Sequence, residues 1–515
     1  MRLGIDFGTT RTVVACADRG NYPVLAFSDD AGDTIDWIPS VVAEVSGQLR
    51  FGFDALAIEG GEGVVVRSFK RLLADEQAAL NQEVRIGNVT IALSDLITAF
   101  LGYVRDAIRT RSTIADDMRG EEIVSVVAVP ANASGAQRLL TLDAFRRAEL
   151  GPIAMLNEPS AAGFEYTHRH RDTLTSKRDH VVVYDLGGGT FDASLVRMRG
   201  ASHEVLATEG HNTLGGDDFD EAIVDLVLRR LDLAKEDVEP AALSRLRDEC
   251  RQAKERLNPS SRKTSIDVEA ALGAAAKVSE VTLPVADIYD ACTPLVEASI
   301  DAMLPVMAKL QTAESGDSHE GLAGIYVVGG ASELPIVGRL LRARFGRRVH
   351  RSPYASGAIA IGLAIACDDH AGFELIDRYS RTFGVFRESQ AGAEITFDPI
   401  FTKDTVLPSS GSAPIAFTRR YRAAHNVGHF RFLECSAVSD DGRPRGHMVL
   451  SGNVLFPFAP ALSRRASDLS DVPVERITDG GPRIEEEYSL DEHGIVAVTI
   501  KNLDAGFVHS VRLGA

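Results

Sequence analysis

Hydrophobic positions in the first 365 residues follow two alternating patterns. Apolar runs typical of buried strands cover 122–130 and 322–331, and each is followed by a stretch with one-face helical spacing. These stretches predict helices over 136–148 and 335–345. Because strands that are apolar on both faces and alternate with helices form covered sheets, the pattern indicates α/β layers.

The order of predicted elements repeats along the chain. The halves, about 1–170 and 180–365, each begin with strand, turn and strand and continue into helices and a further buried strand. Two similar halves predict a duplicated α/β domain with a cleft between two lobes. Further helices are predicted over 96–108 with Ser94 as N-cap, after a loop at 157–166, and over 218–231 and 240–257.

After about residue 370 the helical spacing disappears and short alternating runs take over. Period-two runs are typical of strands with one buried face. The segment 485–502 predicts a hairpin that turns at 491–494 and places Val496, Val498 and Ile500 on one face. We therefore predict an all-β domain here, and no helical stretch follows it in the sequence.

The composition is that of a folded, soluble protein with several domains. A chain of 515 residues exceeds what one core usually holds, and 45% hydrophobic with 25% charged residues is ordinary. The formal net charge is −18. Since nucleic acids and anionic membranes attract basic surfaces, this acidic balance argues against both as partners.

The cysteines and the start of the chain predict a cytoplasmic protein. The five cysteines are scattered without a C-x-x-C pair, which is typical of reduced, mostly buried thiols. The first residues lack the long apolar core of a signal peptide. The longest apolar stretch, Ala358–Cys367, is too short to cross a bilayer.

Two strand–turn–strand segments carry the candidate chemistry. Both 4–10 and 181–192 run from a strand into an aspartate, a glycine turn and a threonine. Glycine turns let backbone N–H groups approach an anion, because no Cβ intervenes. Asp6 and Asp185 are predicted to orient magnesium through its water, since this ion prefers oxygen and sheds water reluctantly. Facing each other, the two segments predict a cage for a polyphosphate and its Mg²⁺.

The ordered motifs resemble the seventy-kilodalton heat-shock chaperones of the DnaK type, within the actin and sugar-kinase superfamily of ATPases. The motifs that carry the resemblance are GIDFGTT, SFKRLL, VPANASGAQR, NEPSAA, DLGGGTFD, LGGDDFD and VVGGASELP. The resemblance implies a duplicated actin-like (ribonuclease H-like) α/β ATPase domain with two lobes over 1–370. It also implies a linker over 371–380 and an all-β sandwich that binds peptide over 381–515. The implied cofactors are ATP or ADP and Mg²⁺.

The resemblance implies that five residues take part in hydrolysis. Lys70 would reach the γ-phosphate and the attacking water, and Glu158 would hold the magnesium shell or the water from the opposite lobe. Asp185 and Asp192 would act as base or orient water, and Thr190 would hydrogen-bond the γ-phosphate. Without the family, Lys70 fits a solvated surface charge and Glu158 fits a carboxylate at a helix start.

The resemblance also assigns residues around the nucleotide, in the interlobe relay and in the peptide channel. Pro130, Arg138 and Asp377 match the relay and the linker, although a surface helix cation is an equally good interpretation of Arg138. Phe417 and Val427 fall near the peptide pocket, and core packing explains both equally well. The nucleotide-contacting set is Gly8, Thr9, Thr10, Gly187, Gly188, Gly189, Gly215, Gly216, Lys254, Gly329 and Gly330.

Three residues depart from the family at the adenine site. Arg251 stands where the family has an acid, whereas Glu255 and Glu333 stand where it has arginines that stack on the base. A carboxylate cannot make the contact of a guanidinium with a ring. We therefore expect weaker nucleotide binding or a relaxed base preference.

Further departures concern partners. Ala154 replaces an arginine that usually engages J-domain proteins, which makes dependence on a J-domain partner doubtful. The linker segment 373–377 keeps Leu375, Ile376 and Asp377 but carries Glu374 in a normally apolar run, so we expect weaker docking. Without a helical lid after the β domain, we expect fast peptide exchange, because affinity differences lie mainly in dissociation rates.

We therefore predict an ATP-hydrolysing chaperone that binds unfolded or extended apolar peptide segments, with a nucleotide exchange factor as a further candidate partner. The alternative is a nucleotide-regulated adaptor whose β domain docks one dedicated partner. A sugar kinase or a filament-forming actin relative would leave the β domain without a role.

Overall fold

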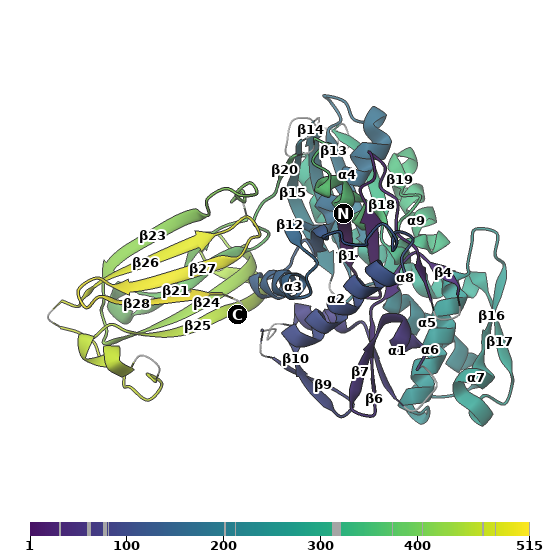
Figure 1. Ribbon diagram of the computed structural model, residues 1–515, viewed down its shortest axis with the longest axis horizontal. Helices are drawn as coiled ribbons and strands as arrows, with labels where there is room; N and C mark the ends of the chain where they lie inside the picture. The colour runs from purple at the N-terminus through teal and green to yellow at the C-terminus, as the bar shows by residue number, and fades with distance from the viewer. Residues whose placement is uncertain are drawn as a thin grey trace.

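The computed structural model describes most of the chain and divides it into an α/β part and a β domain. Figure 1 shows the β domain projecting from one side of the α/β part. The described residues are 1–29, 32–58, 63–75, 80, 82–199, 202–211, 213–311, 321–372, 374–403, 405–465, 468–478 and 480–513. Phe373 of the predicted linker lies outside them.

The first half of the chain builds a five-stranded sheet with strand order β12-β11-β1-β2-β5. β1 pairs antiparallel with β2 and parallel with β11, so a hairpin lies beside a parallel strand. The hairpin holds the first predicted phosphate turn between its strands. The members are β1 (Arg2–Phe7), β2 (Arg11–Cys16), β5 (Ile38–Pro39), β11 (Val124–Val129) and β12 (Pro152–Asn157).

The second half builds a six-stranded sheet of similar arrangement, with strand order β19-β18-β13-β14-β15-β20. β13 pairs antiparallel with β14 and parallel with β18, as β1 does with β2 and β11. The arrangement agrees with the repeat that the sequence predicts. The members are β13 (His180–Leu186), β14 (Phe191–Arg199), β15 (Ser202–His211), β18 (Leu322–Val328), β19 (Val349–Arg351) and β20 (Glu374–Ile376).

Strand β20 comes from the predicted linker. It pairs in parallel with β15, over Ser202–Glu204, and so extends the second sheet by one strand. Backbone pairing uses N–H and C=O groups, which a glutamate supplies as any residue other than proline does. Glu374 therefore does not prevent docking of the linker on the α/β part.

Helices cover both sheets and match most of the sequence predictions. The cap prediction is wrong, because α2 begins at Leu93 and Ser94 lies buried in its first turn. Leu93 is itself buried and extends the apolar stripe by one turn. The larger helices are α2 (Leu93–Thr110), α3 (Gly135–Arg147), α4 (Glu158–His170), α5 (Gly216–Leu231), α6 (Pro240–Glu255), α8 (Val285–Gln311), α9 (Pro335–Phe345) and α10 (Ala358–Cys367). Smaller elements are α1 (Gly52–Leu56), α7 (Val268–Leu272), β3 (Phe27–Ser28), β4 (Thr34–Ile35), β6 (Val41–Val45), β7 (Gln48–Phe51), β8 (Val64–Arg67), β9 (Glu83–Ile86), β10 (Val89–Ala92), β16 (Lys263–Asp267) and β17 (Glu280–Pro284).

Helix α8 is the one described helix long and apolar enough to cross a membrane by length and composition. It was not predicted from the sequence, because Pro294 and Pro305 interrupt its helical signal. Ile288, Val296 and Met303 of α8 are fully buried in the core of the second half. A buried core helix passes the same length test.

Helix α10 joins the two halves. It packs on both β1 and α4. A Cβ added at Gly4 of β1 would overlap the carbonyl oxygen of Ala360, and one added at Gly362 would overlap that of Ala161. These backbone contacts fix the first hairpin against α10 and α4.

The β domain consists of two four-stranded sheets packed around one core. The strand orders are β22-β21-β24-β25 and β23-β26-β27-β28. Phe383 and Phe432 of one sheet meet Tyr488 and Val498 of the other in this core. The predicted hairpin is confirmed as β26 and β27, with its three predicted inward residues buried. The strands are β21 (Thr382–Ser389), β22 (Glu394–Phe401), β23 (Ile415–Arg422), β24 (Val427–Val438), β25 (Pro444–Pro457), β26 (Arg483–Leu490), β27 (Val496–Asn502) and β28 (Phe507–Arg512).

Candidate functional site

The turns of the two hairpins face each other. A Cβ added at Gly188 would lie 2.7 Å from Oγ1 of Thr10, in the opposite turn. The turn glycine Gly187 donates its N–H to the carbonyl oxygen of Thr190 at 3.0 Å, which closes the second turn. The close approach leaves no room for a side chain at Gly188, so backbone groups border the space between the turns there.

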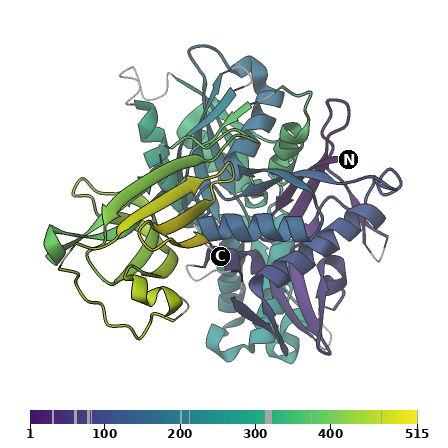
Figure 2. The same cartoon turned by 60° about the vertical axis from the view of Figure 1, so that its left-hand side comes forward.

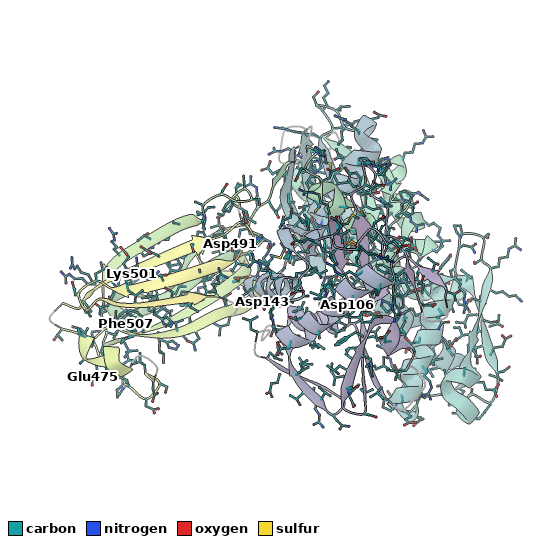
Figure 3. All side chains as sticks on the ribbon, viewed as in Figure 1. Asp106, Asp143, Glu475, Asp491, Lys501 and Phe507 are labelled. Atoms are coloured by element: carbon teal, nitrogen blue, oxygen red, sulfur yellow. The ribbon has the colours of Figure 1, made fainter. Side chains whose placement is uncertain are left out.

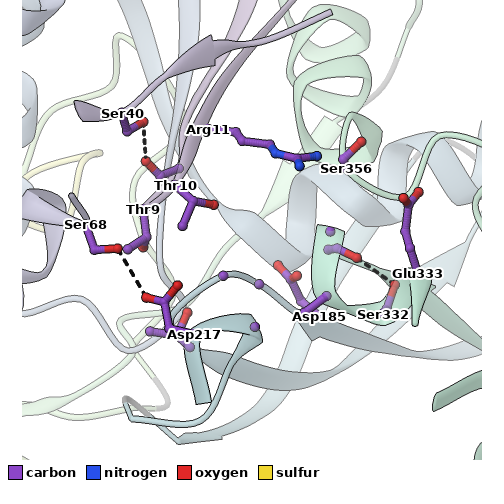
Figure 4. Close-up of a pocket in the computed structure, with 18 of the residues that line it drawn as sticks. Thr9, Thr10, Arg11, Ser40, Ser68, Asp185, Asp217, Ser332, Glu333 and Ser356 are labelled. Carbon is purple, nitrogen blue, oxygen red and sulfur yellow. Dashed lines mark hydrogen bonds between the residues drawn. The ribbon is translucent and has the colours of Figure 1, made fainter. Parts of the chain in front are cut away.

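A cleft of about 1520 Å³ opens between the two lobes at these turns (Figure 4). Most of the residues predicted from the sequence for catalysis and nucleotide binding line it. Gly189 and Gly215 adjoin them, because a Cβ on Gly215 would lie 2.7 Å from the N atom of Gly189. The predicted residues that line the cleft are Asp6, Gly8, Thr9, Thr10, Lys70, Pro130, Glu158, Asp185, Gly187, Gly188, Thr190, Asp192, Gly216, Lys254, Gly329 and Gly330.

Buried charges of both signs meet at the base of the cleft. Nζ of Lys70 lies 3.2 Å from Oε1 of Glu158, and both side chains are buried. Lys70 is therefore not the surface charge that the residue type alone suggests. Burial and the charge of Glu158 raise the pKa of Asp6 to about 7. Burial and the same neighbour also raise the pKa of Asp185 and Asp192 well above the ordinary value.

The cluster fits a cation held through water better than one held directly. Among the described residues, no three His, Cys, Asp or Glu side chains are arranged to hold a metal ion by themselves. Four buried carboxylates against one buried lysine nevertheless leave surplus negative charge, which a cation would relieve. Asp6 and Asp185 thus remain the predicted water-mediated Mg²⁺ ligands.

Two cations at the predicted adenine site have partners within the fold: Lys254, which matches the family, and Arg251, which departs from it. Lys254 donates to the carbonyl oxygen of Gly216 and pairs with Asp220, both at 2.7 Å. Arg251 pairs with Asp217, Asp220 and Asp248. Lys254 and Arg251 thus support the turn at Gly216 and the start of α5.

Three ion pairs cross the cleft from the first lobe to helices α5 and α6 of the second. Arg11 pairs with Glu255 at 2.7 Å, Arg67 with Asp248 at 3.2 Å, and Arg71 with Asp217 at 3.2 Å. Arg71 also donates to the carbonyl oxygen of Gly189 at 3.1 Å. These contacts hold the lobes together on one side of the cleft.

A buried polar chain leads from the α/β part to the β domain. Arg138 of α3 is 1% exposed, which excludes its interpretation as a surface cation. It donates to Oδ1 of Asn157 at 2.6 Å and to the carbonyl oxygen of His493 at 3.1 Å. Asn157 in turn donates to Oδ2 of Asp377 at 2.6 Å. Burial raises the pKa of Asp377, and Arg138 opposes that effect.

A second contact joins the domains at the start of α3, which Figure 2 shows beside the β domain. Glu434 of β24 is 1% exposed and accepts hydrogen bonds from the N–H of Gly135 at 3.2 and 3.1 Å. Arg381 pairs with Glu434 at 3.5 Å and donates to the carbonyl oxygen of Asn132 at 3.4 Å. Glu434 and Arg381 were not predicted from the sequence, because they lie in none of the quoted motifs. Asn132 and Gly135 belong to the quoted VPANASGAQR motif, and Asn157 begins the quoted NEPSAA motif.

The two predicted peptide-contacting residues lie in different sheets of the β domain. Phe417 of β23 packs near Tyr488, with 6.4 Å between ring centroids. Val427 begins β24 and is buried opposite Pro457. Tyr488 also accepts a hydrogen bond from Arg387 at 3.3 Å, and Arg387 forms two further hydrogen bonds with the buried Glu486, at 3.1 and 2.6 Å. The surroundings of Phe417 are thus partly ionic.

Comparison with known proteins identifies the family. The family model described as Hsp70 protein matches residues 2–412. This chain belongs to the Hsp70 family. Members of this family are ATPases and chaperones that bind unfolded peptides. The predicted family and enzyme class are therefore confirmed.

Two curated relatives resemble this Hsp70-family chain over nearly its whole length. One is the chaperone protein HscA homolog of Burkholderia multivorans, which is 30% identical over 99% of this chain and 78% of its own length. The other is the HscA homolog of Burkholderia cenocepacia, which is 29% identical with the same coverage. At 30% identity most positions differ between this chain and these relatives. The roles proposed for the cleft residues therefore rest on the geometry of this chain.

Proposed function

We propose that this protein is a DnaK-type chaperone that hydrolyses ATP to ADP and phosphate and so controls binding of extended apolar peptides. The observation that carries the proposal is the buried pair of Lys70 and Glu158 between two facing glycine turns. Phosphoryl transfer to water requires mainly positioning and neutralisation of charge. The cleft supplies backbone N–H groups for phosphates and charged side chains for the reacting centre.

The proposed roles follow from position. Lys70 neutralises charge on the terminal phosphate, Glu158 holds Lys70, and Asp185 or Asp192 accepts a proton from the attacking water. A carboxylate whose pKa is raised well above its ordinary value is a stronger base and is suited to this role. Asp6 and Asp185 would hold Mg²⁺ through water, and the bound ion would supply further neutralisation of phosphate charge.

Hydrolysis and its coupling to peptide are tested together. We expect turnover of MgATP to rise when extended apolar peptides are added, and MgATP to weaken peptide binding, because each ligand shifts the same equilibrium. Thr190→Ala should lower turnover about tenfold or more while the protein stays folded. Turnover that responds to no peptide would leave a nucleotide-binding protein without the proposed coupling.

A second candidate function is an adaptor that docks one dedicated partner through the β domain. The ion pair of Arg387 and Glu486 near Phe417 favours the adaptor. Charged groups beside a pocket weaken its binding of varied apolar peptides, because desolvating a charge costs free energy. Affinity capture separates the two functions. One stoichiometric partner supports the adaptor, and many unfolded clients support the chaperone.

We propose a cytoplasmic location, because all five cysteines are free and buried, as in proteins of reducing compartments. Ala154 lies half-buried in β12, and we keep the proposal that dependence on an ordinary J-domain partner is doubtful. Titrating a J-domain protein into the ATPase assay tests this. Stimulation of turnover would contradict it.

A further inference from the structure

An arginine at the cleft is held on two sides before any ligand arrives. Arg11 begins β2, and its guanidinium carbon lies 4.6 Å from the ring centroid of Trp37. Its Nη2 atom lies 2.7 Å from Oε2 of Glu255, at the end of α6. All three residues line the cleft, and the Arg11 side chain is 25% exposed. A side chain restrained in this way loses little further freedom on binding a ligand.

The position of Arg11 places it beside a nucleotide held in the phosphate turns. It directly follows Thr10, which lies in the first turn. Figure 4 shows its side chain extending across the pocket toward Ser356 and Glu333, on the opposite wall. A ligand that runs from the turn toward that wall passes Arg11.

The contacts of Arg11 lie on two sides of its guanidinium. Glu255 engages the Nη2 atom, and the guanidinium carbon lies over the ring of Trp37. A guanidinium stacks on rings through its faces, so a base can stack on the side away from Trp37. Lys254, another cation that lines the cleft, is engaged differently, because it is buried and bonded to Gly216 and Asp220.

We propose that Arg11 is the residue that stacks on the base of the bound nucleotide, and that Trp37 and Glu255 position it. This inference rests on the proposed ATPase function and deepens it. The carboxylate of Glu255 cannot stack on a base. In this arrangement it holds the guanidinium of Arg11, which the other lobe supplies. Because Arg11 belongs to the first lobe and Glu255 to the second, the stacked base adds a contact between the lobes. Stacking depends on the flat ring of the base and little on the groups attached to it. We therefore expect the affinities for ATP and GTP to lie within about tenfold of each other.

Calorimetric titration of the full chain with MgATP, MgGTP and magnesium tripolyphosphate tests the proposal. Arg11→Ala should weaken both nucleotides about three- to thirtyfold, the range of a cation–π contact, and leave tripolyphosphate unchanged. Arg11→Lys keeps the charge without the plane and should resemble Arg11→Ala for the nucleotides. Glu255→Ala removes the ion pair of Arg11 but keeps its contact with Trp37, so the loss of nucleotide affinity should be smaller. Arg344→Ala, an exposed arginine that pairs with Asp301, is the matched control and should bind like the wild type.

Trp37 supplies a second readout, because it is the only tryptophan of the chain. Its emission should change on adding either nucleotide and stay constant with tripolyphosphate, and the change should disappear in Arg11→Ala. Equal losses for ATP and tripolyphosphate in Arg11→Ala, or no loss at all, would overturn the inference and leave the ATPase proposal standing. Failure of the wild type to bind MgATP at millimolar concentration would instead overturn both.

Discussion

At the scale of single residues, the buried carboxylates of the cleft bind protons more tightly than exposed carboxylates do. The pKa of Asp6 is raised to about 7 by burial first and by the charge of Glu158 second, whereas Lys70 lowers it. Between about pH 4 and pH 7 the folded protein therefore holds a proton that the unfolded chain has lost. The free energy of unfolding of the ligand-free protein should fall as the pH rises through this window.

The raised pKa of Asp6 predicts proton release when MgATP binds. A cation near Asp6 favours its charged form, so binding near pH 7 should expel a proton. Calorimetry at pH 7 in two buffers of different ionisation enthalpy measures this release. Asp6→Asn should release fewer protons than the wild type. Identical heats for the wild type in both buffers would refute the prediction.

The position of Lys70 predicts that its removal lowers the hydrolysis rate far more than the affinity for MgATP. Lys70→Ala removes the cation that faces Glu158, so the hydrolysis rate should fall about a hundredfold or more. Binding of MgATP should change less than tenfold, because backbone groups of the turns still contact the phosphates. Single-turnover hydrolysis and calorimetry measure the two effects. Lys263→Ala, on an exposed strand, is the matched control, and equal losses in both assays would count against the assigned role.

At the scale of elements, local patterns explain what the sequence could predict. Helix α9 matches its predicted bounds because Pro335 marks its first turn and Gly346 follows its last residue. Helix α8 was missed because two prolines interrupt its periodicity. The two phosphate turns could be predicted as a pair, since each carries its own glycines and carboxylate. The contact of Gly135 with Glu434 joins residues 299 apart in sequence, and no local pattern at Glu434 marks it.

Asn157 is the element-scale link between α3, β12 and the linker. It bonds both Arg138 and Asp377, which are buried. Asn157→Ala leaves two buried charged groups without a shared partner, so the free energy of unfolding should fall by about 1–3 kcal/mol. Thermal melts and limited proteolysis within 371–380 measure the effect. Asn453→Ala, on the exposed side of β25, should leave both unchanged, and a wild-type cleavage rate in Asn157→Ala would contradict the link.

At the scale of the whole molecule, the β domain is attached by one end. Figure 3 shows Asp491, in the turn of the β26–β27 hairpin, at the end nearest the α/β part and Glu475 at the far end. Ile495, next to that turn, packs in the core of the first lobe. The cleft itself reaches Arg381 and His447 of the β domain. The contacts through α3 and the linker therefore give the proposed nucleotide site a route to the β domain that needs no contact between peptide and nucleotide.

The attachment predicts how the domains separate. Glu434→Ala removes the acceptor for the N–H of Gly135 and leaves Arg381 buried without its carboxylate, which together should cost about 3–5 kcal/mol of docking free energy. That is enough to shift a docked molecule to an undocked one, because each 1.4 kcal/mol changes the equilibrium tenfold. Small-angle scattering should then show a larger radius of gyration, while thermal melts of each domain persist. Glu487→Ala, an exposed carboxylate on β26, should scatter like the wild type. An unchanged radius in Glu434→Ala would mean that β20 and Arg138 suffice to hold the domains together.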